Sequence, residues 1–239
     1  MRKKLVLAVT VVSVLLLAAA TVQLVNRDET NPPSSSPLIT MPEEYINYTI
    51  TTINGSLWAK IDGTYPLHVI GWSEPLLLVY PTPPGTTNIS LKMDETELSW
   101  NNFTEIYPEA VHFTALGNWP MINCTIHPVP EYFTLKIHYE HPVMLINGSH
   151  TFLYDLNISP YLSEWSTKST AYFTIRMETS YTSLHVNAIA TDETLTPINY
   201  TTTTDGTAKT VAFSIVSEYS KPLLGDILVT FTTATPQPS

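Results

Sequence analysis

Polar and apolar residues alternate with a period of two over many short segments of this chain after residue 44. Ile46–Ile50, Asn88–Met93, Leu156–Ser159 and Ile198–Thr201 are examples. Successive side chains of a β-strand point to opposite faces, so this period gives each strand one solvent-exposed face and one buried face. Antiparallel sheets with a single core-facing side have this pattern, and two such sheets pack face to face. The sequence therefore predicts an all-β fold built of antiparallel β-sandwich domains, Ig-like in size.

Four dipeptides predict where the strands reverse. Asn54-Gly55, Asp62-Gly63, Asn147-Gly148 and Asp205-Gly206 supply the positive φ angles of two-residue type I′ hairpins. A single helical turn is expected near residues 160–165. The remaining segments predict strands at residues 45–53, 56–61, 64–70, 76–80, 109–116, 121–126, 132–139, 143–146, 151–156, 171–179, 183–190, 198–204, 207–217 and 226–232.

Proline-rich segments predict the domain boundaries. Residues 31–37 read Asn-Pro-Pro-Ser-Ser-Ser-Pro, and residues 127–130 read His-Pro-Val-Pro. We therefore expect a signal-anchor helix, a Pro/Ser-rich spacer and two β-sandwich domains, at residues 1–28, 29–43, 44–128 and 129–235. The alternative is one larger β domain, for which the chain is also long enough.

The N-terminal segment predicts attachment to a membrane. Arg2, Lys3 and Lys4 precede Leu5–Val25, a run of 21 uncharged residues. As a helix this run is about 31 Å long, close to the roughly 30 Å of a bilayer core. The preceding cations place the N-terminus in the cytoplasm, so we expect a single-pass protein of the cell membrane with its C-terminal part extracytoplasmic. Cleavage near Ala18–Ala20 is the alternative, and it would give a secreted protein.

Eight of the thirteen asparagines lie in Asn-X-Ser/Thr acceptors for N-linked glycans. Ser and Thr are 54 of 239 residues, so chance would give roughly three acceptors. The excess predicts an extracytoplasmic glycoprotein, although a Thr-rich β protein also accumulates such triplets by composition. The acceptors are Asn47, Asn54, Asn88, Asn102, Asn123, Asn147, Asn157 and Asn199.

Charge excludes nucleic acid as a partner. All 21 acidic residues but only seven of the eleven Lys and Arg follow residue 27, and those seven are scattered singly. The expected partners are the membrane, through the N-terminal helix, and other surface proteins or glycans. The chain has no Gly-rich phosphate loop, no Gly-X-Ser-X-Gly and no His-Glu-X-X-His, so no cofactor and no catalytic residue are expected.

Cys124 is the one cysteine of the chain, so no intrachain disulfide can form. It lies between Ile122 and Ile126 in an alternating segment, and we expect all three side chains to point inward while Asn123 and Thr125 face solvent. A thiol in apolar surroundings is inert. A nucleophilic role or an intermolecular disulfide is the alternative.

His138-Tyr139-Glu140-His141 is the densest titratable cluster. On a strand, His138 and Glu140 share one face while His141 points to the other, so the two histidines cannot chelate one ion without a bulge. No metal site is therefore expected there. Asp94-Glu95-Thr96-Glu97 lacks the spacing of an EF-hand loop and is interpreted as a solvated turn.

Aromatic residues give the candidates for ligand binding. Trp72 and Trp119 are flanked by Gly71 and Pro120 in expected loops, where exposed aromatic side chains stack on sugars. The alternative is that they fill the core.

Four segments resemble a set of uncharacterised exported archaeal proteins, over the C-terminal half only. They are Phe133–Pro142, Phe152–Leu156, Ser217–Leu223 and Gly225–Leu228. The resemblance implies an archaeal cell surface and no activity or site residues. The sequence thus favours a non-catalytic surface, adhesion or envelope glycoprotein over two alternatives, a carbohydrate- or ligand-binding module and an extracellular hydrolase.

Overall fold

The computed structural model describes residues 37–103, 119–156, 158–190, 192–206, 208–221 and 224–233. Nearly all of this part of the chain is β structure, which confirms the all-β class. Its elements are β1 (Leu38–Thr40), β2 (Glu43–Ile53), β3 (Ser56–Ile70), β4 (Leu76–Pro81), β5 (Thr87–Met93), β6 (Thr96–Glu97), β7 (Trp100–Phe103), β8 (Met121–Ile126), β9 (Tyr132–Pro142), β10 (Met144–Ile146), β11 (Ser149–Tyr154), the short 3-10 helix η2 (Ser159–Tyr161), β12 (Lys168–Met177), β13 (Tyr181–Ile189), β14 (Leu195–Pro197), β15 (Thr201–Asp205), β16 (Ala208–Glu218) and β17 (Asp226–Thr233).

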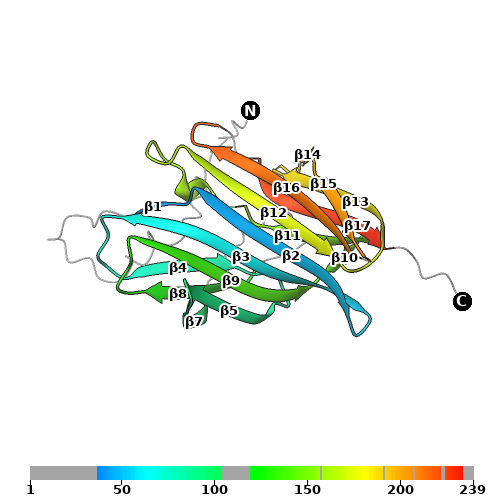
Figure 1. Cartoon of the computed structure of the whole chain (residues 1–239), viewed down its shortest axis with the longest axis horizontal. Helices are drawn as coiled ribbons and strands as arrows, with labels where there is room; N and C mark the ends of the chain where they lie inside the picture. The colour runs from blue at the N-terminus through cyan, green and yellow to red at the C-terminus, as the bar shows by residue number, and fades with distance from the viewer. Residues whose placement is uncertain are drawn as a thin grey trace, which may run out of the picture.

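Nine strands form one large sheet that runs across the molecule (Figure 1). Its order is β15-β16-β12-β2-β3-β9-β5-β6, and β1 also pairs with β3. β2 lies inside this sheet, antiparallel to β3 and parallel to β12. Thr64 and Tyr172 are consequently the two neighbours of Tyr45. The parallel pair departs from the purely antiparallel sheets that the alternation predicted.

Two smaller sheets share a core with the inner face of the large sheet. Their orders are β10-β11-β17-β13-β14 and β4-β8-β7. Ile46 and Ile61 of the large sheet belong to the same buried cluster as Leu78 of β4 and Phe231 of β17. The described strands thus form three unequal sheets in place of the two facing sheets that were expected.

Two of the expected type I′ hairpins have the required backbone. Asn54 and Gly55 have φ angles of 51° and 80°, and Asn147 and Gly148 have 51° and 80°. Each pair joins two antiparallel strands directly, β2 to β3 and β10 to β11. Both predictions are confirmed, and Asp205-Gly206 likewise lies at the reversal from β15 to β16.

The hairpin predicted at Asp62-Gly63 is wrong. Both residues lie inside β3, a continuous strand of 15 residues, and Gly63 pairs with Ile46 of β2 and Ile137 of β9. The glycine serves close packing instead of a turn. A methyl group built at Gly63 would collide with the ring of Tyr65, which lies over it on the same face.

The large sheet continues across the boundary expected between residues 128 and 129. β9 pairs with β3, and β12 pairs with β2, so strands from the C-terminal half complete a sheet begun by the N-terminal half. β1 also occupies residues 38–40 of the expected spacer.

The expected signal-anchor helix at residues 1–28 lies outside the described residues, as does the strand expected at 109–116. Within the part of the chain that is described, no helix has the length and apolarity needed to cross a membrane.

Candidate ligand-binding cavity

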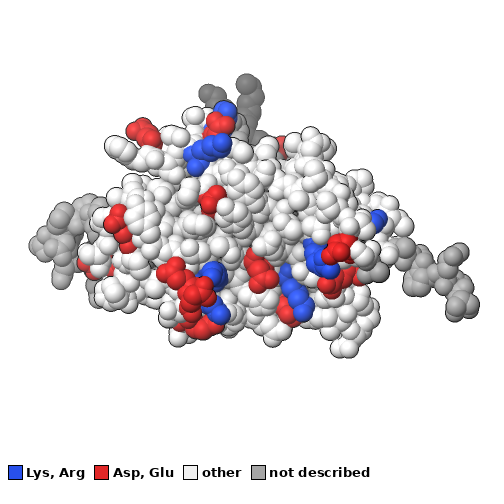
Figure 2. Space-filling model, viewed as in Figure 1, with Lys and Arg blue, Asp and Glu red and all other residues white. Residues whose placement is uncertain are grey.

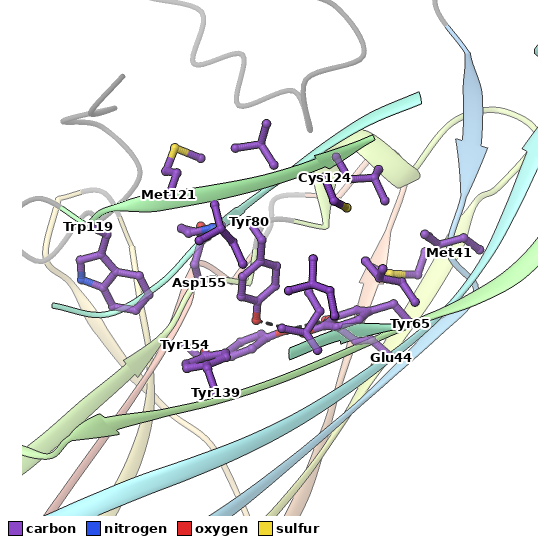
Figure 3. Close-up of a pocket in the computed structure, with 18 of the residues that line it drawn as sticks. Met41, Glu44, Tyr65, Tyr80, Trp119, Met121, Cys124, Tyr139, Tyr154 and Asp155 are labelled. Carbon is purple, nitrogen blue, oxygen red and sulfur yellow. Dashed lines mark hydrogen bonds between the residues drawn. The ribbon is translucent and has the colours of Figure 1, made fainter. Parts of the chain in front are cut away.

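A cavity of about 80 Å³ lies where the three sheets meet (Figure 3). The large sheet contributes Glu44, Tyr65 and Tyr139 to its lining. Tyr80 of β4 and Cys124 of β8 come from the three-stranded sheet, and Tyr154 and Asp155 come from the end of β11. One water molecule needs about 10–15 Å³ of cavity volume, so this cavity has room for roughly six water molecules.

Three tyrosines and a glutamate form a chain of hydrogen bonds along the cavity. The hydroxyl of Tyr65 lies 3.0 Å from that of Tyr80 and 3.1 Å from that of Tyr154. Tyr154 donates to Oε2 of Glu44 over 2.9 Å. This series of hydrogen bonds therefore links all three sheets. Each of its side chains would be costly to bury without a hydrogen-bonding partner.

The strand pleat determines which of these side chains point inward. Glu44, Ile46 and Tyr48 alternate with exposed Tyr45 and Asn47 along β2, so the pleat that buries Ile46 also buries Glu44. Gly63 provides the room for Tyr65 in the adjacent strand, as described above. The hydroxyl of Tyr65 can then reach both Tyr80 and Tyr154.

Burial shifts the proton equilibrium of Glu44. Its side chain is only 3% exposed. Loss of solvation raises its pKa to about 7, and the hydrogen bond from Tyr154 offsets part of that rise. At neutral pH the group is therefore divided between its neutral and ionised forms, which is unusual for a glutamate.

Asp155 is the second carboxyl group of the cavity and lies close to Asp226 of β17. Burial raises the pKa of Asp155 well above its usual range, and the charge of Asp226 and a hydrogen bond with it add to the rise. Asp226 is itself buried, and its Oδ1 accepts a hydrogen bond from the backbone N–H of Leu156 over 3.1 Å. Glu44 raises the pKa of Asp155 further through its charge, so the carboxyl groups form one electrostatic unit.

The described part of the lining contains no compensating positive charge. None of its described residues is Lys, Arg or His. The five tyrosines of the lining, Tyr65, Tyr80, Tyr139, Tyr154 and Tyr161, have pKa values raised by burial, so they stay neutral. The cavity is thus acidic and rich in hydroxyl groups, with walls of Leu, Ile and Met.

The two tryptophans singled out from the sequence lie in different settings. Trp119 is buried, with 3% of its surface exposed, and lines the cavity next to Met121. Trp72 is half-buried and packs against the larger core. Trp119 is therefore a residue of the cavity wall, and Trp72 keeps part of its surface in solvent.

The histidine cluster divides between two faces, as the strand pattern predicted. His138 is partly exposed, and its Nδ1 lies 2.8 Å from Oδ1 of Asp62. His141 is 3% exposed and its Nδ1 bonds the carbonyl of Pro142. Burial lowers the pKa of His141 to about 4. Among the described residues no group of three His, Cys, Asp or Glu side chains is placed to hold a metal ion.

Cys124 points inward between Ile122 and Ile126, as expected, and all three are 2% exposed. Loss of solvation raises the pKa of its thiol to about 11. The thiol is therefore protonated at neutral pH, which is the inert form.

The glycan acceptors lie mainly on the surface. Asn123 is half-buried, and the side chain of Asn157 is outside the described residues. Leu91 and Ile158, which alternate with acceptor positions, are buried, whereas Ile89 is half-buried. The six exposed acceptors are Asn47, Asn54, Asn88, Asn102, Asn147 and Asn199.

The sequence analysis did not single out Glu44, Asp155 or the tyrosines. A signal for Glu44 was present, because the alternation that predicts an inward Ile46 also turns Glu44 inward. Asp155 lies just after β11, and only the fold brings it beside Asp226 of β17.

Comparisons with known proteins identify a fold and no family. No family model and no curated protein matches the chain. A solved protein of Legionella pneumophila, whose proposed role is nutrient binding, is similar over 83% of this chain and 68% of its own length, with a TM-score of 0.55 and 11% identity. An M1 zinc metallopeptidase from Deinococcus radiodurans has a TM-score of 0.44 at 15% identity, and yeast LTA4 hydrolase has 0.43 at 10%. This chain covers 42% and 31% of those two enzymes. At these identities the likeness to the Legionella protein shows the fold alone.

Proposed function

We propose that this chain is a membrane-anchored extracytoplasmic glycoprotein with a non-catalytic role at a cell surface, that of an archaeon. The observation that carries the proposal is the exposure of the acceptor asparagines. Six of the seven acceptors whose side chains are described are exposed, and the seventh is half-buried. A glycan is bulky and hydrophilic, so it needs this placement.

The outer face of the large sheet supports the same proposal. Figure 2 shows small clusters of acidic and basic groups separated by wide uncharged surface. Lys60 and Lys136 of this sheet form ion pairs with Glu140 and Glu95. Asn47 is exposed on β2 in this sheet, opposite Asp62 of β3, and an attached glycan would project from this face into solvent.

The anchor is the second part of the proposal. Leu5–Val25 is long enough to span a bilayer as a helix. We expect the full chain to remain with the membrane fraction and to keep its N-terminal residues. A soluble protein whose N-terminus begins near Thr21 would show that the segment is a cleaved signal.

Intact mass of the full chain tests the glycans, with production in an archaeal or eukaryotic host that attaches N-glycans and in one that does not. We expect a heavier protein from the first host. Asn102→Gln should remove the mass of one glycan, and the matched control Asn101→Gln should remove none, because the exposed Asn101 is outside an acceptor triplet. An unmodified mass from the glycosylating host would refute the proposal.

The cavity favours the ligand-binding module as a second candidate function. Its polar groups come from all three sheets and converge on a space that can hold a small molecule. The hydrolase alternative has less support. A glycosidase places two carboxyl groups on either side of a sugar linkage, and space for roughly six waters does not admit a sugar ring on each side.

A further inference from the structure

We propose that the cavity binds a small organic cation, a primary alkylammonium, between Glu44, Asp155 and the tyrosine hydroxyls. The inference rests on the ligand-binding alternative and adds the chemical class of the ligand. It uses neither the glycans nor the anchor.

The first step is that the carboxyl groups have no cationic partner in the described lining. Glu44 and Asp155 line one cavity with Asp226 beside them, and the described lining offers no Lys, Arg or His. A buried carboxylate is stable only with a cationic or hydrogen-bonding partner, and otherwise it takes up a proton. A bound cation would replace that proton and leave the carboxylate ionised beside a counter-charge.

The second step is the supply of acceptors. A primary ammonium donates three hydrogen bonds and accepts none. Tyr154 already donates its proton to Glu44, so its oxygen is left to accept. Tyr65 lies within hydrogen-bond distance of both Tyr80 and Tyr154, and hydroxyl protons rotate to suit a new partner. Carboxylate and hydroxyl oxygens can therefore surround one ammonium group.

The third step concerns the walls. Leu78, Leu91, Leu135 and Ile137 line the cavity together with the aromatic rings, so the surroundings favour an alkyl chain. Tyrosine faces also attract a desolvated cation. Ca²⁺ needs six to eight oxygen ligands and Mg²⁺ keeps several waters, which apolar walls do not provide. The space of about 80 Å³ limits the ligand to a few heavy atoms.

n-Butylammonium and 1-butanol test the charge of the ligand, since each has five heavy atoms in one unbranched chain. Calorimetric titration of the full chain in mild detergent at pH 7 should show binding of n-butylammonium at least about tenfold tighter than 1-butanol, the factor expected for charge-assisted hydrogen bonds. Binding should also release protons, because burial raises the pKa values of both Glu44 and Asp155 and the two groups must ionise beside the cation. Titrations in phosphate and in HEPES, whose ionisation enthalpies differ and neither of which is a primary amine, measure that release.

Two variants, Glu44→Gln and Asp155→Asn, test whether the preference for n-butylammonium arises in the cavity, and Glu43→Gln is their control. Glu44→Gln should reduce both the proton release and the preference for n-butylammonium, with the remainder due to Asp155. Glu43→Gln removes the same charge from the neighbouring residue, which points away from the core, and should preserve both. Asp155→Asn, which should weaken n-butylammonium binding about tenfold or more, is the second variant if Glu44→Gln does not fold.

The outcomes distinguish the assignment of the ligand as a cation from the ligand-binding function itself. Equal affinity for n-butylammonium and 1-butanol would overturn the cation assignment and preserve the binding module. No binding of either probe would overturn both. A loss of preference in Glu43→Gln equal to that in Glu44→Gln would show that the net acidity of the protein, not the cavity, attracts the cation.

Discussion

Glu44→Gln gives a quantitative test of the buried carboxyl group. Glutamine keeps an oxygen that can accept the hydrogen bond from Tyr154 and removes only the ability to ionise. The folded-state pKa of Glu44 is about 7 against an ordinary value of 4.5. Between pH 4.5 and about 7, the folded protein therefore keeps a proton on Glu44 that the unfolded chain has already lost. Folding stability from this group is present at low pH and falls as the pH rises through 7.

The size of the effect follows from the shift in pKa. One pKa unit corresponds to about 1.4 kcal/mol, so the full shift corresponds to about 3 kcal/mol. Much of that loss falls between pH 5 and pH 8. We therefore expect the free energy of unfolding of Glu44→Gln, relative to the unsubstituted protein, to increase by about 2 to 3 kcal/mol between pH 5 and pH 8.

Urea unfolding followed by tryptophan fluorescence measures this difference at each pH, with the full chain in mild detergent. The comparison must be between the two proteins, because other groups also titrate. His141 acts in the opposite direction below pH 6.5, and Asp155 acts in the same direction as Glu44. Glu43→Gln is the matched control and should show no such change. Parallel stability curves for Glu44→Gln and the unsubstituted protein would refute the reasoning.

Three further substitutions test other parts of the structure. Gly63→Ala should cost about 1 to 3 kcal/mol in urea unfolding, because a methyl group there meets the ring of Tyr65; unchanged stability would contradict the close packing. Cys124 should react slowly with a thiol reagent in the native state and rapidly in urea, and Cys124→Ser should lose about 1 to 3 kcal/mol if its hydroxyl finds no partner; rapid native labelling would contradict its burial. His141 has a pKa of about 4, so the unfolded chain binds its proton first and about 3 kcal/mol of stability should be lost as the pH falls from 6.5 to 4. In His141→Gln that loss should disappear, and an unchanged acid dependence would show that other groups cause it.

The sequence predicted those parts of the fold that depend on local chemistry. Asn54-Gly55 and Asn147-Gly148 mark hairpins because their backbone needs positive φ angles, and the inward position of Cys124 follows from the pleat. Asp62-Gly63 shows the limit of this reasoning. The same dipeptide chemistry occurs there, but the contact between Gly63 and Tyr65 and pairing on both sides of β3 hold the segment extended.

The candidate site was harder to predict because its parts are distant in sequence. Glu44 and Tyr154 meet only because β2 and β11 lie in sheets that pack together. A pattern of period two shows that Glu44 points inward, and it does not show which groups it meets. The parallel pairing of β2 with β12 has no local signal at all, since no turn connects the two strands.

That parallel pair also affects the order in which the molecule can be assembled as the chain is synthesised. β2 is among the first strands to be synthesised, whereas its neighbour β12 follows only after β11 and η2. Until then one edge of β2 has no partner, and an unpaired edge is a site for aggregation with other chains. Asn47 lies in this strand, opposite Thr174 of β12 and exposed on the outer face. In the glycoprotein that we propose, a glycan at Asn47 would be next to that open edge and would hinder its pairing with another molecule before β12 arrives.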